Sequence, residues 1–176
     1  MRVRSLLLTL VLSLLVGKSL GVSFTLDGIT YVANADTAII KGYDAIPENG
    51  ELALASTVSY GGKDYRVTTV QNSAFLSCTE LKKLVVPSTI KYIREGAFEN
   101  CVNMTQLVLS EGEERLDAAG DALKNCGIEE VTIGRNLKEG IFCNSESLVT
   151  VKLAKNVTTI PSYAFSGCKK LSAINL

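Results

Sequence analysis

The sequence contains no histidine and no tryptophan. Without histidine, the chain lacks the side chain that most often acts as a general acid or base near neutral pH, and it cannot form Ser–His or Cys–His nucleophile pairs. A common zinc ligand is missing for the same reason. The chain also has no glycine-rich phosphate loop and no Cys-x-x-Cys pair. We therefore expect a protein that is not an enzyme and that uses no cofactor and no metal.

Neither sign of charge is in large excess. The chain carries 18 basic and 18 acidic side chains. Removal of residues 1–21 takes away three cations, at positions 2, 4 and 18, and leaves 15 basic and 18 acidic side chains. Binding to nucleic acid requires a basic face that displaces counterions from phosphates. The sequence therefore predicts no nucleic-acid partner.

Long apolar runs are absent after residue 22, and the one near the start is short. It covers the eleven residues 6–16, follows Arg2 and Arg4, and is followed by Ser19-Leu20-Gly21. This pattern is typical of a secretory signal peptide, and eleven residues are too few to span a hydrocarbon core of about 30 Å. We expect a signal peptide at residues 1–21, no membrane span after its cleavage, and a secreted or cell-surface protein.

One phrase occurs five times in the rest of the chain. It consists of a small or apolar residue, an anchor that is aromatic or leucine, and a cysteine or serine three residues after the anchor. An apolar triplet of the form Leu-x-x-Leu-x-Leu follows each copy. The anchors are Phe75, Phe98, Leu123, Phe142 and Phe165, so they lie 23, 25, 19 and 23 residues apart. A repeat of this length with this triplet is typical of a leucine-rich solenoid.

The spacing inside one copy predicts two elements. In the first copy, the apolar residues between positions 74 and 81 fall on one face of a helix. Leu84 and Val86 then alternate with outward residues, as in a strand. We expect an α/β repeat fold, a leucine-rich repeat solenoid with one short parallel strand and one short helical turn per repeat, and about five repeats in residues 67–176.

Residues 22–66 lack the repeat. Asp27-Gly28 and Gly61-Gly62 separate short runs rich in β-formers, as in hairpins. Because the first coil of a solenoid must be covered, we expect a β-rich N-terminal cap at residues 22–66. At the other end, Leu176 stands at an inward strand position. That ending suggests either a fragment of a longer protein or self-association through an open C-terminal edge.

Four of the five cysteines occupy the same position in their repeats. Equivalent positions of a solenoid stack into a column, so we expect buried thiols that fill space. A disulfide such as Cys78–Cys101 is the alternative, because neighbouring coils lie about 5 Å apart. Cys143 lies outside the column and is the candidate for an exposed thiol. The column consists of Cys78, Cys101, Cys126 and Cys168.

The phrase Ala-Phe-x-x-Cys-x-x-Leu, preceded by Ile-x-x-Ile and often by Pro-Ser, resembles the BspA-type leucine-rich repeat. The closest stretches are residues 87–101 and 156–168. The resemblance implies a surface or secreted protein of host-associated bacteria or parasitic protists. It also implies a binding module, in some members an adhesin for matrix or plasma proteins. No functional residue carries over, because the matching positions are core positions.

Strand residues that alternate with the leucines should face outward. We predict that they form a partner-binding face whose centre is the β-branched stripe Val85, Val108 and Thr132. The alternative is that these residues reflect only strand propensity. The predicted face consists of Lys83, Val85, Gln106, Val108, Glu130, Thr132, Thr150 and Lys152.

Two classes of function, and a third idea, follow from this face. The first is an adhesin-like module that binds an extracellular host, matrix or plasma protein. The second is a glycan-binding surface protein of polysaccharide capture. It ranks lower because the chain has no tryptophan and places no tyrosine or phenylalanine at the outward strand positions. The third is a structural spacer within a larger surface protein.

Overall fold

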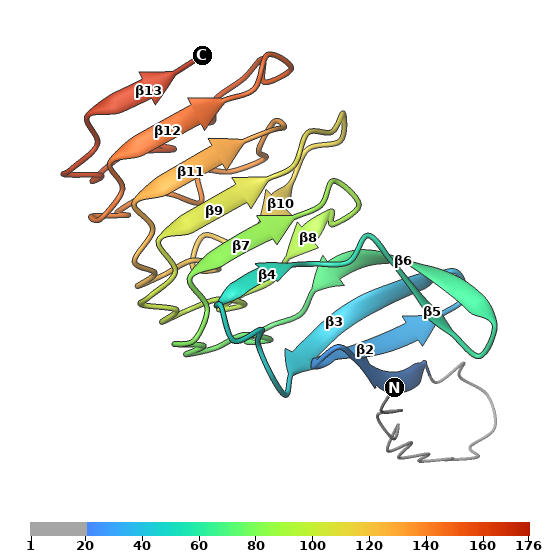
Figure 1. Cartoon of the computed structure of the whole chain (residues 1–176). Helices are drawn as coiled ribbons and strands as arrows, with labels where there is room; N and C mark the ends of the chain where they lie inside the picture. Colours follow the sequence, from blue (N-terminus) through green and yellow to red (C-terminus); the bar gives the residue numbers. More distant parts are fainter. Residues whose placement is uncertain (1–20) are drawn as a thin grey trace.

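One long parallel sheet runs along the molecule and is built from one strand per coil (Figure 1). The computed structural model describes residues 21–176, so the predicted signal peptide lies outside the described residues except for Gly21. We call this sheet the leucine sheet. Its strands, in spatial order, are β4 (Glu51–Ala53), β7 (Lys83–Val86), β9 (Gln106–Leu109), β11 (Glu130–Ile133), β12 (Thr150–Leu153) and β13 (Ala173–Asn175).

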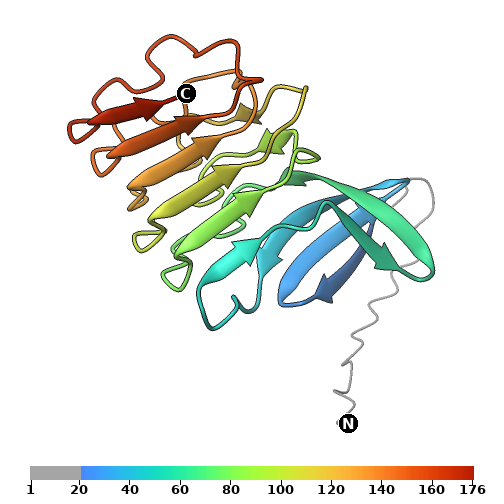
Figure 2. The ribbon, with the colours of Figure 1, turned by 45° about the horizontal axis from the view of Figure 1, so that its top comes forward.

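A second sheet, which we call the back sheet, lies on the other side of the first coils and ends at β10 (Figure 2). Its first three strands are antiparallel, and from β3 onward its strands along the coils are parallel. Strand β5 (Thr57–Tyr60) pairs with β6 outside the main order. The main order is β1 (Val22–Leu26), β2 (Ile29–Asn34), β3 (Thr37–Tyr43), β6 (Lys63–Val70), β8 (Tyr92–Ile93) and β10 (Asp117–Ala118).

The core fills the space between the two sheets. The inward residues of β7, β9 and β11 are buried, as the Leu-x-x-Leu-x-Leu triplets predict. In β12 Val151 is buried and Leu153 is partly buried, and in the last copy Ile174 and Leu176 are exposed. The ring of Phe75 stacks on that of Phe98 at 4.9 Å and on that of Tyr43 at 5.4 Å, so an aromatic column runs through the first coils. A leucine-rich solenoid is therefore confirmed.

The predicted helical turn is wrong. The part of the chain that the structure describes contains no helix, and so none that could cross a membrane. Two residues after each anchor the backbone has a positive φ, whereas a right-handed helix needs φ near −63°. Asparagine and glycine tolerate this conformation better than most residues. The five residues are Ser77, Asn100, Asn125, Asn144 and Gly167, with φ of 56°, 63°, 58°, 60° and 75°.

The hydrogen bonds of these turns also exclude a helix. The Phe75 amide donates to the Ala97 carbonyl of the next coil at 2.7 Å, and the Ser77 amide donates to Glu99 at 2.8 Å. In an α-helix both amides would donate to carbonyls four residues earlier in the chain. The helical spacing of the apolar residues thus records which side chains face the core. The Phe75 and Ser77 amides bond to the next coil, and the Cys78 amide bonds to a carbonyl only three residues earlier.

All five cysteines are free, and the alternative of a disulfide between coils is not observed. Cys78 and Cys101 are buried as predicted, Cys126 and Cys168 are partly buried, and Cys143 is exposed. In three coils the thiol donates to the anchor carbonyl of the preceding coil, so the column does more than fill space. The pairs are Cys101 with Phe75, Cys126 with Phe98 and Cys168 with Phe142, at 3.2, 3.0 and 3.0 Å.

The segment 22–66 contains five of the strands, and they do not all form hairpins. Strands β1, β2 and β3 pair antiparallel in succession. Strand β4, in contrast, joins the leucine sheet, where it pairs parallel with β7 and brings Ala53 opposite Val85. The segment therefore extends the same outward face that the repeats build.

Tyr163 provides a test of the backbone geometry. It precedes the last Ala-Phe pair, has φ of 59°, and leaves 81% of its surface exposed. A left-handed conformation costs an L-residue about 1–2 kcal/mol, and glycine avoids this cost. We predict that Tyr163→Gly is more stable than Tyr163→Ala by about 1 kcal/mol in urea unfolding. Both variants lose the same exposed ring, so equal stabilities would show that the conformation carries no cost.

Candidate functional site

The strand register places all eight predicted face residues on the outward side of the leucine sheet. They stand in two straight columns, because each strand pairs with the next without a shift. None of the eight is buried. One column contains Lys83, Gln106, Glu130 and Thr150, and the other contains Val85, Val108, Thr132 and Lys152. The structure therefore brings together the residues that the repeat pattern predicted.

Strand β4 extends this face in a way that the repeat pattern missed. Glu51 continues the first column beyond Lys83, and Ala53 continues the second column beyond Val85. The two strands begin at residues 51 and 83, a separation larger than any repeat in the chain, so no period connects them. Only the local pattern could have predicted this strand, since the buried Leu52 and Leu54 alternate with exposed residues as in the later strands.

The charges of the face neutralise one another. The Lys83 Nζ lies 3.8 Å from a Glu51 carboxylate oxygen, and the Lys152 Nζ lies 2.8 Å from Glu130. Exposed pairs of this kind contribute only about 0–1 kcal/mol to stability. Their larger effect is on the surface, because the uncharged stripe Val85, Val108 and Thr132 lies between two compensated pairs. The face offers apolar contact without a net local charge.

Arg135, which the sequence reasoning missed, fixes one border of the face. Its side chain is fully buried in the loop that follows β11. Its Nη1 donates to the carbonyls of Ser88 at 2.9 Å and Ile90 at 2.8 Å, and its Nη2 donates to Pro87 at 3.2 Å. These acceptors belong to the loop after β7, so the guanidinium joins loops that are two coils apart.

Among residues 21–176, no carboxylate forms an ion pair with the buried Arg135 side chain. Burial lowers the pKa of Arg135 to about 10, and the Glu114 carboxylate acts in the opposite direction. Glu114 itself forms an ion pair with Lys91 at 2.7 Å. A side chain at Gly112 would place a Cβ 2.7 Å from the Ser88 Cβ, so glycine lets the intervening loop pass beside Arg135. The guanidinium therefore acts here as a structural donor to backbone carbonyls.

A family model for the BspA type Leucine rich repeat region matches residues 68–176 with six copies, one more than the anchors indicate. The chain belongs to the BspA-type leucine-rich repeat family. This family suggests a protein-interaction module rather than a catalyst, and a location at the cell surface. No curated protein sequence matches the chain.

Solved structures of bacterial leucine-rich repeat proteins share the fold. A leucine-rich repeat protein of T. pallidum is 26% identical with a TM-score of 0.66, and the match covers 87% of this chain and 71% of that one. A leucine rich cell surface protein from Faecalibacterium prausnitzii is 20% identical with a TM-score of 0.60. That match covers 88% of this chain but only 42% of the F. prausnitzii protein, so the chain spans less than half of its length.

Replacement of Arg135 tests its role at the border of the face. We predict that Arg135→Met lowers the free energy of unfolding by about 3 kcal/mol, because the Ser88 and Ile90 carbonyls lose a buried donor. Arg135→Lys keeps the charge but loses the fork of donors, so it should fall between Met and the parent protein. Urea unfolding measures both. A change of less than about 0.5 kcal/mol for the Met variant would contradict this role.

Proposed function

We propose that this BspA-type repeat protein is an adhesin-like extracellular module that binds a host or matrix protein through the outward face of the leucine sheet. The observation that carries the proposal is the unbroken register of six parallel strands. It presents two columns of side chains with Val85, Val108 and Thr132 at their centre.

The chemistry of the face favours a protein partner. Protein interfaces have a core depleted in charge and a polar rim. The Val–Val–Thr stripe fits such a core, and the pairs Lys83–Glu51 and Lys152–Glu130 fit such a rim. Because the strands are held by a continuous ladder, the face loses little conformational entropy on binding, and this favours affinity.

The organisation of the whole chain fits this role as part of the same proposal. Residues 1–21 direct export, residues 22–66 cover the first coil, and residues 67–176 provide the repeats. In support of the cover, the Tyr43 ring of the first segment stacks on Phe75 at 5.4 Å, and β3 pairs with β6. Self-association through β13 stays a prediction; its Ile174 side chain is exposed.

The test of the proposed function is a charge placed in the centre of the face. The double variant Val85→Asp/Val108→Asp should lose saturable binding to its ligand from a panel of immobilised matrix proteins, plasma proteins and glycans, because two buried carboxylates in the interface would be unpaired. We expect a loss of at least about 100-fold in affinity. Surface plasmon resonance on the secreted full chain measures this loss, with circular dichroism to verify folding.

Val102→Asp is the matched control, because Val102 is 52% exposed and lies on a turn outside the leucine sheet. It introduces the same charge and should leave binding within about twofold of the parent protein. Protein binding that survives the double variant would place the contact elsewhere. Binding confined to glycans, or to nothing in the panel, would contradict the proposed protein partner.

A further inference from the structure

Strand β1 forms an open edge of the back sheet. Within residues 21–176 it pairs only with β2, along all five of its residues and without a bulge. Natural edge strands are usually protected by charged side chains, proline or a bulge, because their free backbone groups can pair with another chain. The sequence of β1, Val-Ser-Phe-Thr-Leu, contains no charged residue and no proline. This edge is therefore open to a further strand.

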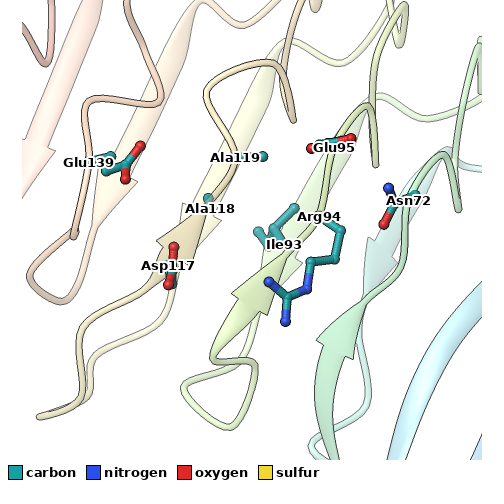
Figure 3. A pocket seen from close by; sticks show the side chains of 8 residues that line it. All are labelled: Asn72, Ile93, Arg94, Glu95, Asp117, Ala118, Ala119 and Glu139. Atoms are coloured by element: carbon teal, nitrogen blue, oxygen red, sulfur yellow. The ribbon is translucent and has the colours of Figure 1, made fainter.

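The opposite edge of the same sheet is protected. Strand β10 has only two residues and carries Asp117, whose carboxylate accepts a hydrogen bond from the Lys138 Nζ at 2.7 Å. Figure 3 shows Asp117 and Glu139 at this end of the sheet, where they line a hollow of about 180 Å³ together with Glu95. Short length and charge both keep an edge strand from pairing. Of the two edges, β1 is the one that favours association.

The core side of β1 carries apolar side chains that the core does not cover. Each of its three apolar residues lies opposite a β2 residue that is 3% exposed, so all three point to the core side. Yet Val22 is 45% exposed and Leu26 is 40% exposed. Phe24 is partly buried, and its ring stacks on that of Tyr60 at 4.5 Å. An apolar row thus extends beyond the edge of the core.

The other side of β1 is polar. Ser23 and Thr25 are exposed there, and the Thr25 hydroxyl donates to the Asp44 carboxylate at 3.3 Å. A strand that joins this edge must alternate in the same way, with its apolar residues on the core side. The β1 strand of a second copy does so when it runs antiparallel with Phe24 opposite Phe24. Opposite residues then share a face, so Val22 meets Leu26 of the second copy.

The ends of such a pair are also complementary in charge. Asp27 follows β1 directly and is exposed. Cleavage after Gly21, a step that rests on the proposed function, gives Val22 an α-ammonium group. In the antiparallel arrangement, Asp27 of one copy lies opposite position 21 of the other and so beside this ammonium group. The two-fold axis forms the same pair twice, and complementary charges of this kind help to fix the register.

We propose that two copies of this protein associate through β1, as a two-fold symmetric antiparallel pair that joins their back sheets. This pairing uses the β1 edge of each copy, so it is isologous and closes as a dimer. Val22, Phe24 and Leu26 of both copies form one apolar cluster at its centre. The contact is separate from the proposed protein-binding face. The dimer presents two such faces, which increases avidity for a ligand with several binding sites.

A charge placed in the apolar row tests the dimer. Sedimentation equilibrium on the secreted full chain should show a rise in mass from one copy to two between about 1 and 300 µM. Leu26→Lys places two ammonium groups in the shared cluster and should raise the dissociation constant at least about tenfold. Leu76→Lys is the matched control, because Leu76 is 44% exposed on a turn outside both sheets. It should dimerise as the parent protein does, and circular dichroism verifies that both variants fold.

Cysteine pairs test the antiparallel register. Copies with Val22→Cys and copies with Leu26→Cys are mixed, both with Cys143→Ser to remove the exposed thiol. The two thiols should form a disulfide between copies, since opposite residues are close enough for one. Oxidised glutathione accepts the two electrons and leaves as two glutathione thiols. Either variant alone should not crosslink, because residue 22 lies four residues, about 13 Å, from its equivalent in the second copy.

The outcomes that overturn the proposal are distinct. A parent protein that stays a single copy over the whole concentration range leaves this edge to another chain or to none. Association of Leu26→Lys as strong as that of the parent places the contact elsewhere, for example at β13. Crosslinking of either cysteine variant alone as efficient as that of the mixture contradicts the register. The double variant Val85→Asp/Val108→Asp should dimerise like the parent, so a failure of the protein-binding face does not affect this test.

Discussion

The hydrogen bonds between successive coils are the interaction on which the rest of this structure depends. The leucine sheet grows by one strand per coil, the back sheet does so as far as β10, and tight turns such as those at Phe75 and Phe98 donate amides to the next coil. A single coil buries too few side chains to offset the entropy of ordering its backbone, so stability arises from stacking. Cys101 and Cys126 add to this pattern, because each thiol donates to a carbonyl of the preceding coil.

The hydrogen bonds between successive coils also explain how the outward residues of the leucine sheet are arranged. Because the strands of the leucine sheet pair without a shift in register, equivalent outward residues lie in straight columns. The face that contains Val85 and Val108 therefore follows directly from the repeat. Where the repeat is irregular, the surface changes instead of the core. The third coil keeps its inward leucine-type positions but has Ala119 where the second coil has Arg94. The leucine sheet thus offers a face whose charges are paired.

The repeat period was enough to predict the solenoid, the leucine sheet and the eight face residues, because each depends on spacing that recurs in every coil. It failed where the outcome depends on a single position. The turns resemble helices in the spacing of Ala74, Phe75 and Cys78, yet their backbone is set by residues such as Asn100 that adopt a positive φ. The repeat period could not predict that β4 joins the leucine sheet, because the segment between β4 and β7 is longer than any repeat. The repeat period could not predict the role of Arg135 either, because among the described coils only one contains a buried arginine that donates to three backbone carbonyls.

The most direct test of the account is native-state amide hydrogen exchange on the full chain. If coil-to-coil bonds hold the turns, the amides of Phe75 and Phe98 should exchange as slowly as those of Leu107 and Val131 in the leucine sheet, because the same cooperative opening exposes all four. Their partners lie in the next coil, at Ala97 and Ala122, at 2.7 and 2.9 Å. Rapid exchange of the two turn amides while the strand amides stay protected would contradict the claim that the stack, and not the single coil, orders the turns.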